Sequence, residues 1–368
     1  MAIKCTSGQA LHRLEALKHS RYRTNRTLPL AVAIAFVLGA GPARAAGGNE
    51  VASSGRFCSA TAFNLFKACG HGVVDTFLVA KAKCLNVSDQ GKRQECFAEA
   101  TSARNKEPQL CREERDGRLD ACKSLGEDRY DPDFAPANFD DPKNPTNPNP
   151  YYPLEVGNSW KYRGGDELNT VEVLNATKLI EKVTCIVVRD QVFKNGDLAE
   201  NTDDWFVPAK DGNTWYCGEE VKDYQSFDGD APRAPELVMI DGTFKVGRNG
   251  AKPGIIFQAF PTVGQVYREE SAVDNAEDVS EILSTTYAFG NDPNGLDQFV
   301  PKPLADRLCS ARDCVVTRAF SLLDPGPLVR KYFARDIGFF LEVKPDTGEV
   351  LQLVDCSFDA RCVGLPTP

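Results

Sequence analysis

The stretch CREERDGRLDAC, residues 111–122, has a helix-forming composition and carries a cysteine at each end. Eight of the ten residues between these cysteines are polar, charged or glycine, so a helix here has almost no apolar face to bury. Such a helix must be stabilised by something other than apolar packing. We therefore expect Cys111 and Cys122 to form disulfides with a second helix.

Six cysteines, from residue 58 to residue 122, lie in pairs that are symmetric about residue 90. An antiparallel helical hairpin that turns at NVSDQG, residues 86–91, brings the two members of each pair to the same height. Steps of 11 and 15 residues within each arm are close to three and four helical turns, which keeps the thiols near one face, and 12 residues separate the two cysteines that flank the turn. Gly70 and Gly72 weaken the first helix and are the main threat to this prediction. The predicted disulfides are Cys58–Cys122, Cys69–Cys111 and Cys84–Cys96.

A metal or redox site is the alternative use of these cysteines. His71 is the only histidine after residue 45, and none of the six cysteines has the C-x2-C spacing of a zinc site. We therefore expect structural disulfides, no metal and no cofactor.

Residues 1–45 have the pattern of an export signal. A basic segment precedes the apolar run LPLAVAIAFVLGA, residues 28–40, and an A-x-A cleavage site follows at residues 43–45. This predicts a secreted or periplasmic bacterial protein whose remaining twelve cysteines are oxidised. No later apolar run approaches the roughly 18 residues of a membrane span, so we expect a soluble mature chain.

Removing residues 1–45 leaves 36 of the 43 basic and 51 of the 52 acidic side chains. Because nucleic-acid affinity depends on neutralising phosphates, so acidic a chain is not expected to bind nucleic acid.

Composition divides the mature chain into a six-cysteine helical hairpin at residues 46–127, a linker at residues 128–153 and a β domain at residues 154–368. The linker holds seven prolines, so it can be neither a helix nor a central strand. Its Asp and Asn residues lack the spacing of a calcium loop, which favours a solvated, extended connector.

After residue 160, short alternating runs are separated by turn signals. Asn195-Gly196 and Asp211-Gly212 lie between strand-like segments, and such dipeptides favour tight β-hairpins. We expect nine or ten strands in one curved antiparallel sheet or half-open barrel. The fold class is therefore α+β.

Two-residue turns at these sites would place Cys185, Phe206 and Cys217 in one row across three strands. Because next-but-one strands lie roughly 9.5 Å apart, Cys185 should not bond Cys217 unless a bulge at Pro208 changes the register. The close pairs Cys309/Cys314 and Cys356/Cys362 indicate local loop closures. Cys185 and Cys217 either pair after all or exchange with one of these pairs.

Several motifs resemble those of an uncharacterised family of secreted bacterial proteins. They are NPYYPLEVGNSWKY at residues 149–162, DGNTWYCGEE at residues 211–220 and GAKPGI at residues 250–255. RLDACKSLGEDRYDPDF, just before them, resembles the end of a cysteine-rich helical segment that some members carry. The resemblance spans most of residues 110–356 and implies a secreted all-β domain with no catalytic residues to transfer. Cys217, the insertion SFDGDAPRAPELVMI and the longer segment around residues 291–314 depart from the family pattern.

Candidate chemistry is limited by the residues available. A Ser-His-Asp arrangement would need His71, and no G-x-S-x-G motif is present. Paired carboxylates in TDDW, with Asp203 and Asp204, and in CGEE, with Glu219 and Glu220, are a further option. Strand alternation lets at most one member of each pair point inward.

Aromatic side chains at alternating strand positions suggest a different role. Most should be core, but a curved sheet with an unfilled concave face would use some of them to line an apolar groove. The glycine-rich segment GRNGAKPG adds a candidate rim residue. The candidate ligand-binding residues are Trp160, Trp205, Trp215, Tyr216 and Lys252.

These observations favour a non-enzymatic binding module that holds an apolar ligand or a partner protein on a sheet face. The alternatives are a secreted carboxylate-dependent hydrolase and a structural component of an envelope or extracellular assembly.

Overall fold

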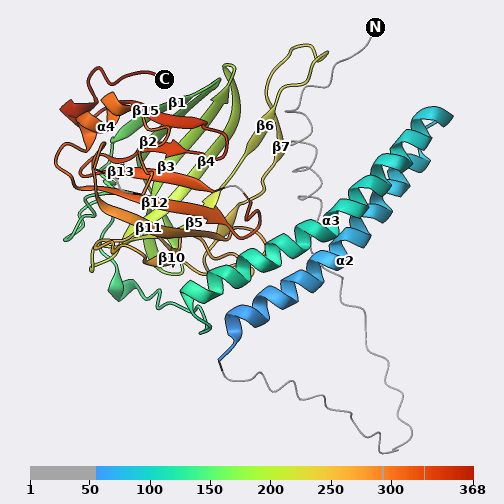
Figure 1. The fold of residues 1–368 in the computed structure, drawn as a ribbon, viewed down its shortest axis with the longest axis horizontal. Helices are drawn as coiled ribbons and strands as arrows, with labels where there is room; N and C mark the ends of the chain where they lie inside the picture. The colour runs from blue at the N-terminus through green and yellow to red at the C-terminus, as the bar shows by residue number, and fades with distance from the viewer. Residues whose placement is uncertain (1–54, 292–293, 327) are drawn as a thin grey trace, which may run out of the picture. The chain divides into compact units, whose positions relative to one another are not determined.

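A computed structural model describes residues 55–291, 294–326 and 328–368. The predicted export signal, residues 1–45, lies outside the described residues. Within them, two long helices precede a large antiparallel sheet that is not closed, which confirms the predicted α+β class (Figure 1).

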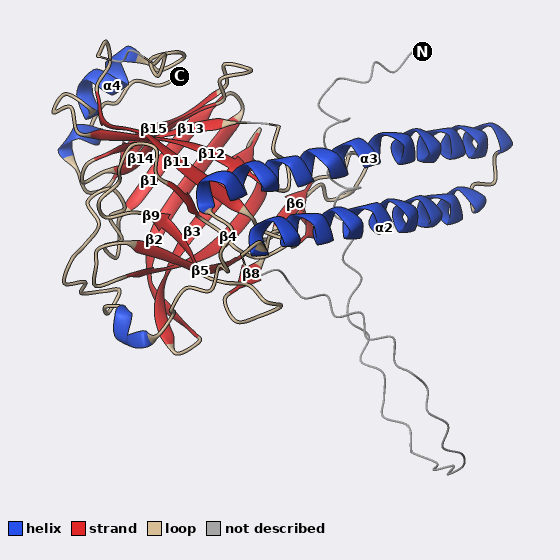
Figure 2. Cartoon of the chain, turned by 60° about the horizontal axis from the view of Figure 1, so that its bottom comes forward, coloured by secondary structure: helices blue, strands red, loops and turns tan. Residues whose placement is uncertain are grey.

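The two long helices form the predicted disulfide-stapled hairpin. Helix α2 (Phe57–Leu85) and helix α3 (Gln90–Leu125) are joined by a four-residue turn at the predicted position (Figure 2). Disulfides Cys69–Cys111 and Cys84–Cys96 join them, with Cα atoms 5.7 and 5.5 Å apart. Cys58 and Cys122 are disulfide-bonded as well. Helix α2 continues without a break through Gly70 and Gly72.

Apolar packing inside the hairpin is sparse. Its buried cluster consists of Cys69, Val73 and Cys111, with Phe66 packed against them. Large apolar side chains of α2, such as Phe63 and Leu78, are about half exposed, at 49% and 56%. Disulfides therefore supply stability that the apolar contacts of these helices do not.

Packing divides the chain into two compact units between Arg112 and Glu113, inside α3, whereas the predicted domain boundary follows residue 127. The last turns of α3 belong to the second unit. There, Arg118 forms a buried ion pair with Glu277, with 2.9 Å between Nη2 and Oε1.

The proline-rich segment, residues 128–153, contains only a short 3-10 turn, η2 (Pro136–Asn138). It is not a solvated connector, because Phe139 and Tyr151 are each only 7% exposed. Asn149 donates from Nδ2 to the carbonyl oxygens of Gly212 and Phe257, which fixes the segment against the sheet. The predicted extended conformation is present, but the segment packs as part of the β domain.

The sheet contains fifteen strands in the described part of the chain, more than the nine or ten expected. Twelve form a continuous path in the order β10-β11-β12-β13-β14-β15-β1-β2-β3-β4-β5-β8, and β6, β7 and β9 pair beside it. The strands are β1 (Ser159–Gly164), β2 (Glu167–Ile180), β3 (Val183–Lys194), β4 (Asp197–Pro208), β5 (Thr214–Glu220), β6 (Asp223–Gln225), β7 (Glu236–Met239), β8 (Phe244–Lys245), β9 (Gly254–Phe257), β10 (Val266–Arg268), β11 (Asp278–Tyr287), β12 (Cys314–Ser321), β13 (Val329–Ala334), β14 (Gly338–Val343) and β15 (Val350–Cys356). The remaining elements are helix α4 (Lys302–Leu308) and the 3-10 turn η3 (Ala360–Cys362).

Strong curvature brings the two ends of this path together. Strand β9 pairs with β5, and Lys252, just before β9, bridges to Ser271, just after β10. Gly254 packs so closely against β10 that a Cβ there would lie 1.9 Å from the Glu269 carbonyl oxygen. Residues from opposite ends of the strand order can therefore face one another across a common interior.

The predicted row of Cys185, Phe206 and Cys217 is wrong. Phe206 pairs with Ile186 on β3 and with Tyr216 on β5, one residue away from each cysteine. One bulge lies near the β3–β4 turn. The other lies on β5, where Gly218 adopts a φ of +128° that favours glycine.

Register shifts place both cysteines on the face opposite Phe206. Cys185 and Cys217 form a disulfide there, with Cα atoms 6.8 Å apart. A bulge was the predicted condition for this bond, although it lies between the pairs of Trp205 and Phe206 rather than at Pro208. The local pairs Cys309–Cys314 and Cys356–Cys362 are confirmed.

Strands β3 to β5 are buried on both faces. The inner face carries Ile186, Val188, Phe206 and Tyr216, which belong to the largest core cluster. The outer face carries Cys185, Val187, Trp205, Val207 and Cys217, and Phe134 and Phe139 of the proline-rich segment pack on it. A covering segment therefore explains why β3 reads as an apolar run, VTCIVV, rather than as a strict alternation.

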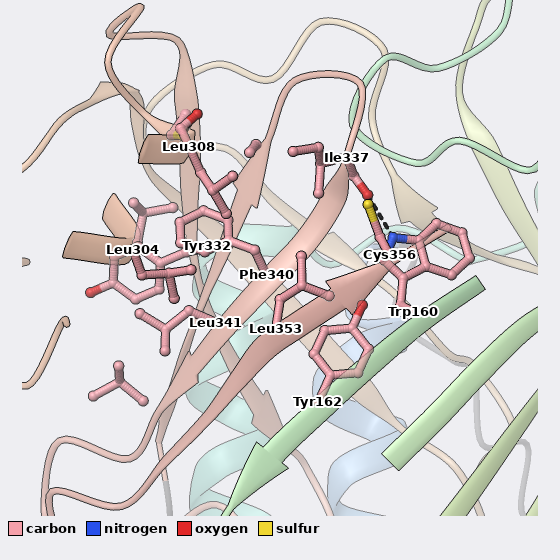
Figure 3. Close-up of a cluster of buried hydrophobic side chains, with 14 of the residues drawn as sticks. Trp160, Tyr162, Leu304, Leu308, Tyr332, Ile337, Phe340, Leu341, Leu353 and Cys356 are labelled. Carbon is pink, nitrogen blue, oxygen red and sulfur yellow. Dashed lines mark hydrogen bonds between the residues drawn. The ribbon is translucent and has the colours of Figure 1, made fainter. Parts of the chain in front are cut away.

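The largest cluster continues from β1 to β13, β14, β15 and α4 (Figure 3). Trp160 on β1 donates a 2.8 Å hydrogen bond from Nε1 to the Ile337 carbonyl oxygen, so its polar atom is satisfied inside the core. Leu304 and Leu308 of α4 pack into the same cluster beside Tyr332.

We predict that replacing Cys69 and Cys111 together by serine destabilises the hairpin by about 2 to 4 kcal/mol, because this disulfide closes a long loop. Urea unfolding followed by circular dichroism at the helical band should shift to lower urea. Tryptophan fluorescence should not shift, because Trp160, Trp205 and Trp215, the three tryptophans of the chain, all belong to the β domain.

The matched control is the double serine variant of Cys309 and Cys314, which are only 5 residues apart. It should leave the helical transition unchanged. A helical transition that is the same in both variants would contradict the role assigned to the disulfides.

Candidate functional site

A cavity of about 350 Å³ lies on the inner face of the curved sheet. Strands β1 to β5 contribute one wall, and β9, the β10–β11 connection, β13, β14 and β15 contribute the other. Its lining residues are Tyr152, Pro153, Leu154, Trp160, Tyr162, Asn169, Val171, Val188, Asp190, Asp204, Phe206, Tyr216, Ile256, Glu269, Glu270, Asp278, Lys331, Phe333, Gly338, Phe339, Glu342 and Leu351.

Aromatic rings form the apolar part of the lining. Phe206 stacks on Tyr216, with ring centroids 4.7 Å apart, and Tyr152 meets Phe206 edge to face at 5.2 Å. Tyr162 packs against Phe339 at 5.2 Å and donates a 3.0 Å hydrogen bond from its hydroxyl to the Phe339 carbonyl oxygen. These contacts hold the rings in fixed orientations, which suits a preformed ligand site.

Carboxyl groups form the polar part of the lining. Strand alternation places Asp190 of β3 and Asp204 of β4 on the same face as Val188 and Phe206. The other wall adds four more carboxyl groups, those of Glu269, Glu270, Asp278 and Glu342. Lys331 is the only basic residue among the lining side chains.

Asp204 is one of the lining acids whose pKa lies well above the ordinary carboxyl value. Burial, together with the charges of Glu200 and Asp203, raises its pKa to about 7, although a hydrogen bond from Tyr216 opposes the shift. The Tyr216 hydroxyl donates this bond to Asp204 Oδ1. Asp204 is therefore poised between its neutral and charged forms near neutral pH.

Other carboxyl groups share this environment. Glu219 pairs directly with Asp204 across strands β4 and β5, and burial followed by the Asp204 charge raises its pKa. Burial also raises the pKa of Glu270, helped by the charges of Asp278 and Glu219. These raised pKa values favour the neutral forms of both glutamates.

Lys331 forms an ion pair with one of these acids. Its Nζ lies 3.7 Å from Glu269 Oε2, and the Glu269 charge, followed by other acids, raises the lysine pKa. Ser280 donates a 2.5 Å hydrogen bond to the other oxygen of Glu269. This lysine therefore neutralises Glu269 and is also the cross-strand partner of Glu342, so one basic residue in the cavity wall faces several acids.

Two oxygen atoms in the lining lack a hydrogen-bond partner. They are Oδ1 of Asn169, a residue only 8% exposed, and Oδ1 of Asp190. Both residues line the cavity. Buried acceptors without donors are rare in folded proteins, so each marks a position in the wall where water or a bound molecule can donate a hydrogen bond.

Of the predicted ligand-binding residues, Trp160 and Tyr216 line the cavity. Trp205 and Trp215 lie on the outer face, where Trp205 packs among the cluster around Cys185 and Trp215 meets Phe139 edge to face at 5.9 Å. Adjacent strand positions point to opposite faces, which separates Trp215 from Tyr216.

Lys252 does not line the cavity either. Its Nζ forms a 2.5 Å ion pair with Asp131 of the proline-rich segment, and the two side chains are 42% and 70% exposed. The glycine-rich segment therefore contributes a close approach of the backbone at Gly254 rather than a cationic ligand contact.

The alternation argument for paired carboxylates is consistent with the structure. Asp204 and Glu219 face inward, whereas Asp203 forms an ion pair with Arg189 at 2.9 Å and Glu220 forms one with Lys222 at 2.5 Å. The sequence analysis missed Asp190, although a signal was present. An acid in the apolar run IVVRDQVF, in phase with Ile186 and Val188, marks a charge on a buried face.

Among the described residues, no group of three or more His, Cys, Asp or Glu side chains is arranged to hold a metal ion. None of the helices in the described part of the chain has the length and apolarity needed to cross a membrane.

Comparisons with protein-family models, curated proteins and solved structures gave no match. The family resemblance therefore rests on the motifs quoted above.

We predict that Asp204→Asn stabilises the protein above about pH 7. The folded state holds the Asp204 proton more tightly than the unfolded state does, so stability falls as pH rises from the ordinary carboxyl pKa toward about 7. Asparagine removes this penalty, which is on the order of 2 to 4 kcal/mol for a shift of this size.

Urea unfolding at about pH 4 and about pH 8 checks this, and the gain should be present only at the higher pH. Asp355→Asn is the matched control, because Asp355 is an exposed residue of β15 that pairs with Lys161 and does not line the cavity. A gain of equal size at both pH values would contradict the assignment.

Proposed function

We propose that the protein is an exported, non-enzymatic binding protein that holds a small organic ligand in the cavity of its curved sheet. The observation that carries this proposal is the cavity itself. At about 350 Å³ it falls in the range of small-molecule sites, and it combines fixed aromatic rings with a few converging polar groups.

Export is part of the proposal. Five disulfides are formed within the described chain, and Cys58 and Cys122 are bonded as well. Such a number is typical of an oxidising compartment. The predicted signal at residues 1–45 and the motif resemblance support secretion or a periplasmic location in a bacterium and membership of the secreted family.

The sequence predicted an apolar ligand, and the cavity lining restricts the class of ligand further. Aromatic rings favour an apolar body, but six carboxyl groups in the wall disfavour a ligand that is apolar throughout. The ligand must therefore offer polar hydrogen atoms or charge beside its apolar part.

A carboxylate-dependent hydrolase is the second candidate, and the pKa of about 7 for Asp204 is the observation that favours it. Glycoside hydrolysis needs two carboxyl groups on either side of the scissile bond. Glu219 is the direct cross-strand neighbour of Asp204 on the same wall and is not part of the cavity lining, which favours binding over hydrolysis. Hydrolysis of a polysaccharide panel that is lost in Asp204→Asn would favour the hydrolase instead.

We predict that protein purified from its native source carries a ligand. Its mass under native conditions should exceed the mass under denaturing conditions by one defined increment. Equal masses would favour a structural or partner-binding role.

Filling the cavity tests where this ligand is held. Val171→Trp places a large ring in the lining and should remove the mass increment, whereas Thr170→Trp should keep it. Thr170 is the preceding residue of β2 and points to the opposite face, so it controls for the added bulk. Ligand retained in both variants would place it outside the cavity.

A further inference from the structure

We propose that the ligand of this cavity is an organic primary amine, with an ammonium group held by Asp190, Asn169 and neighbouring carboxylates and an apolar body placed against the aromatic rings. This inference rests on the proposed binding function and adds the chemical class of the ligand.

Charge in the lining is strongly unbalanced. Six carboxyl groups face the cavity and Lys331 is the only basic residue among its lining side chains. Because Lys331 lies beside Glu269, the excess of acid falls on Asp190, Asp204 and the other acids. A cationic ligand would supply the missing counter-charge, and an anionic one would add to the repulsion.

Unpartnered acceptors give an independent indication of the same chemistry. Asn169 Oδ1 and Asp190 Oδ1 are buried in the cavity wall and accept no hydrogen bond from the protein. Their residues are close on the sheet, because Asn169 is two positions before Val171, the cross-strand partner of Asp190. A donor group with more than one N–H can serve both acceptors, and a primary ammonium has such donors whereas a quaternary ammonium lacks them.

A metal ion is the competing cation, and the arrangement disfavours it. Calcium needs six to eight converging oxygen ligands, whereas the acids here are distributed over β3, β4, β11 and β14 and over residues 269–270. No three acidic, histidine or cysteine side chains among the described residues are placed to share one metal ion.

Aromatic rings complete the site for an amine with an apolar body. Phe206 and Tyr216 form a stacked pair beside Asp204, and Tyr152 closes over Phe206. Ring faces attract cations as well as apolar groups, so the rings favour an organic cation over a hydrated inorganic one.

The test uses the full secreted protein, freed of any bound molecule, and three probes measured by isothermal titration calorimetry. Phenylethylamine carries the charge and the N–H donors, phenylethanol carries a donor without charge, and the trimethylammonium derivative of phenylethylamine carries charge without N–H donors. We expect the amine to bind at least about tenfold more tightly than either of the others, because hydrogen bonds that carry a charge are stronger than neutral ones.

Two variants locate the ammonium group. Asp190→Asn and Asn169→Leu should each weaken amine binding by about tenfold or more and leave phenylethanol binding nearly unchanged. Asp203→Asn, on the outward position of β4, is the matched control and should bind the amine as the unmodified protein does. Near-ultraviolet circular dichroism of each variant checks that the aromatic core is intact.

Equal binding of amine and alcohol, or no effect of Asp190→Asn, would overturn the amine inference and leave the binding function standing. Amine binding that persists in Val171→Trp would instead overturn the cavity as the ligand site. Calcium is titrated in the same way. Tight binding of calcium without binding of the amine would assign the acids to a metal ion and also overturn the inference.

Discussion

Side-chain alternation in a sheet that is covered on both faces is the constraint on which the rest of the β domain depends. In β4, Asp204 and Phe206 face the cavity, whereas Trp205 and Val207 face the proline-rich segment. A slip of one residue would place the Asp204 carboxyl group in the apolar outer cluster and Trp205 in the cavity. The cavity and the outer disulfide therefore depend on the same register, which the bulge at Gly218 helps to set.

The two compact units offset the conformational entropy that is lost on folding in different ways. The sheet has a large apolar interior, with residues such as Tyr332, Ile186 and Leu353 fully buried. The hairpin has few buried apolar side chains, so disulfides that restrict its unfolded state provide much of its stability. This difference follows from the sequence of residues 111–122, CREERDGRLDAC, which has cysteines at positions where most packed helices have leucines.

Local patterns in the sequence predicted the hairpin, its turn and the strand-rich second domain, because these depend on neighbours in the chain. The cavity could be predicted only in part. Trp160 and Tyr216 were identified as aromatic residues of strands, but alternation alone did not show which face of β5 the cavity occupies. The row through Cys185 was wrong because a register shift between Val192 and Phe193, which no turn signal marks, moves the β3–β4 pairing by one residue. The bridge between Lys252 and Ser271, which brings β9 beside the segment after β10, was not predictable, because it depends on how strongly the sheet curves.

Acids in the cavity lower the stability of the sheet that holds them. Burial raises the pKa values of Asp190, Asp204 and Glu270, so each of these groups is less stable as an anion in the folded protein than in water. Apolar side chains of similar volume at the same positions would fold more stably, since Ile186, Val188 and Phe206 are apolar neighbours on this face. A requirement for stability therefore does not account for these acids. The cationic ligand proposed above would account for them, because its charge would favour their ionised forms and its binding would stabilise the folded protein.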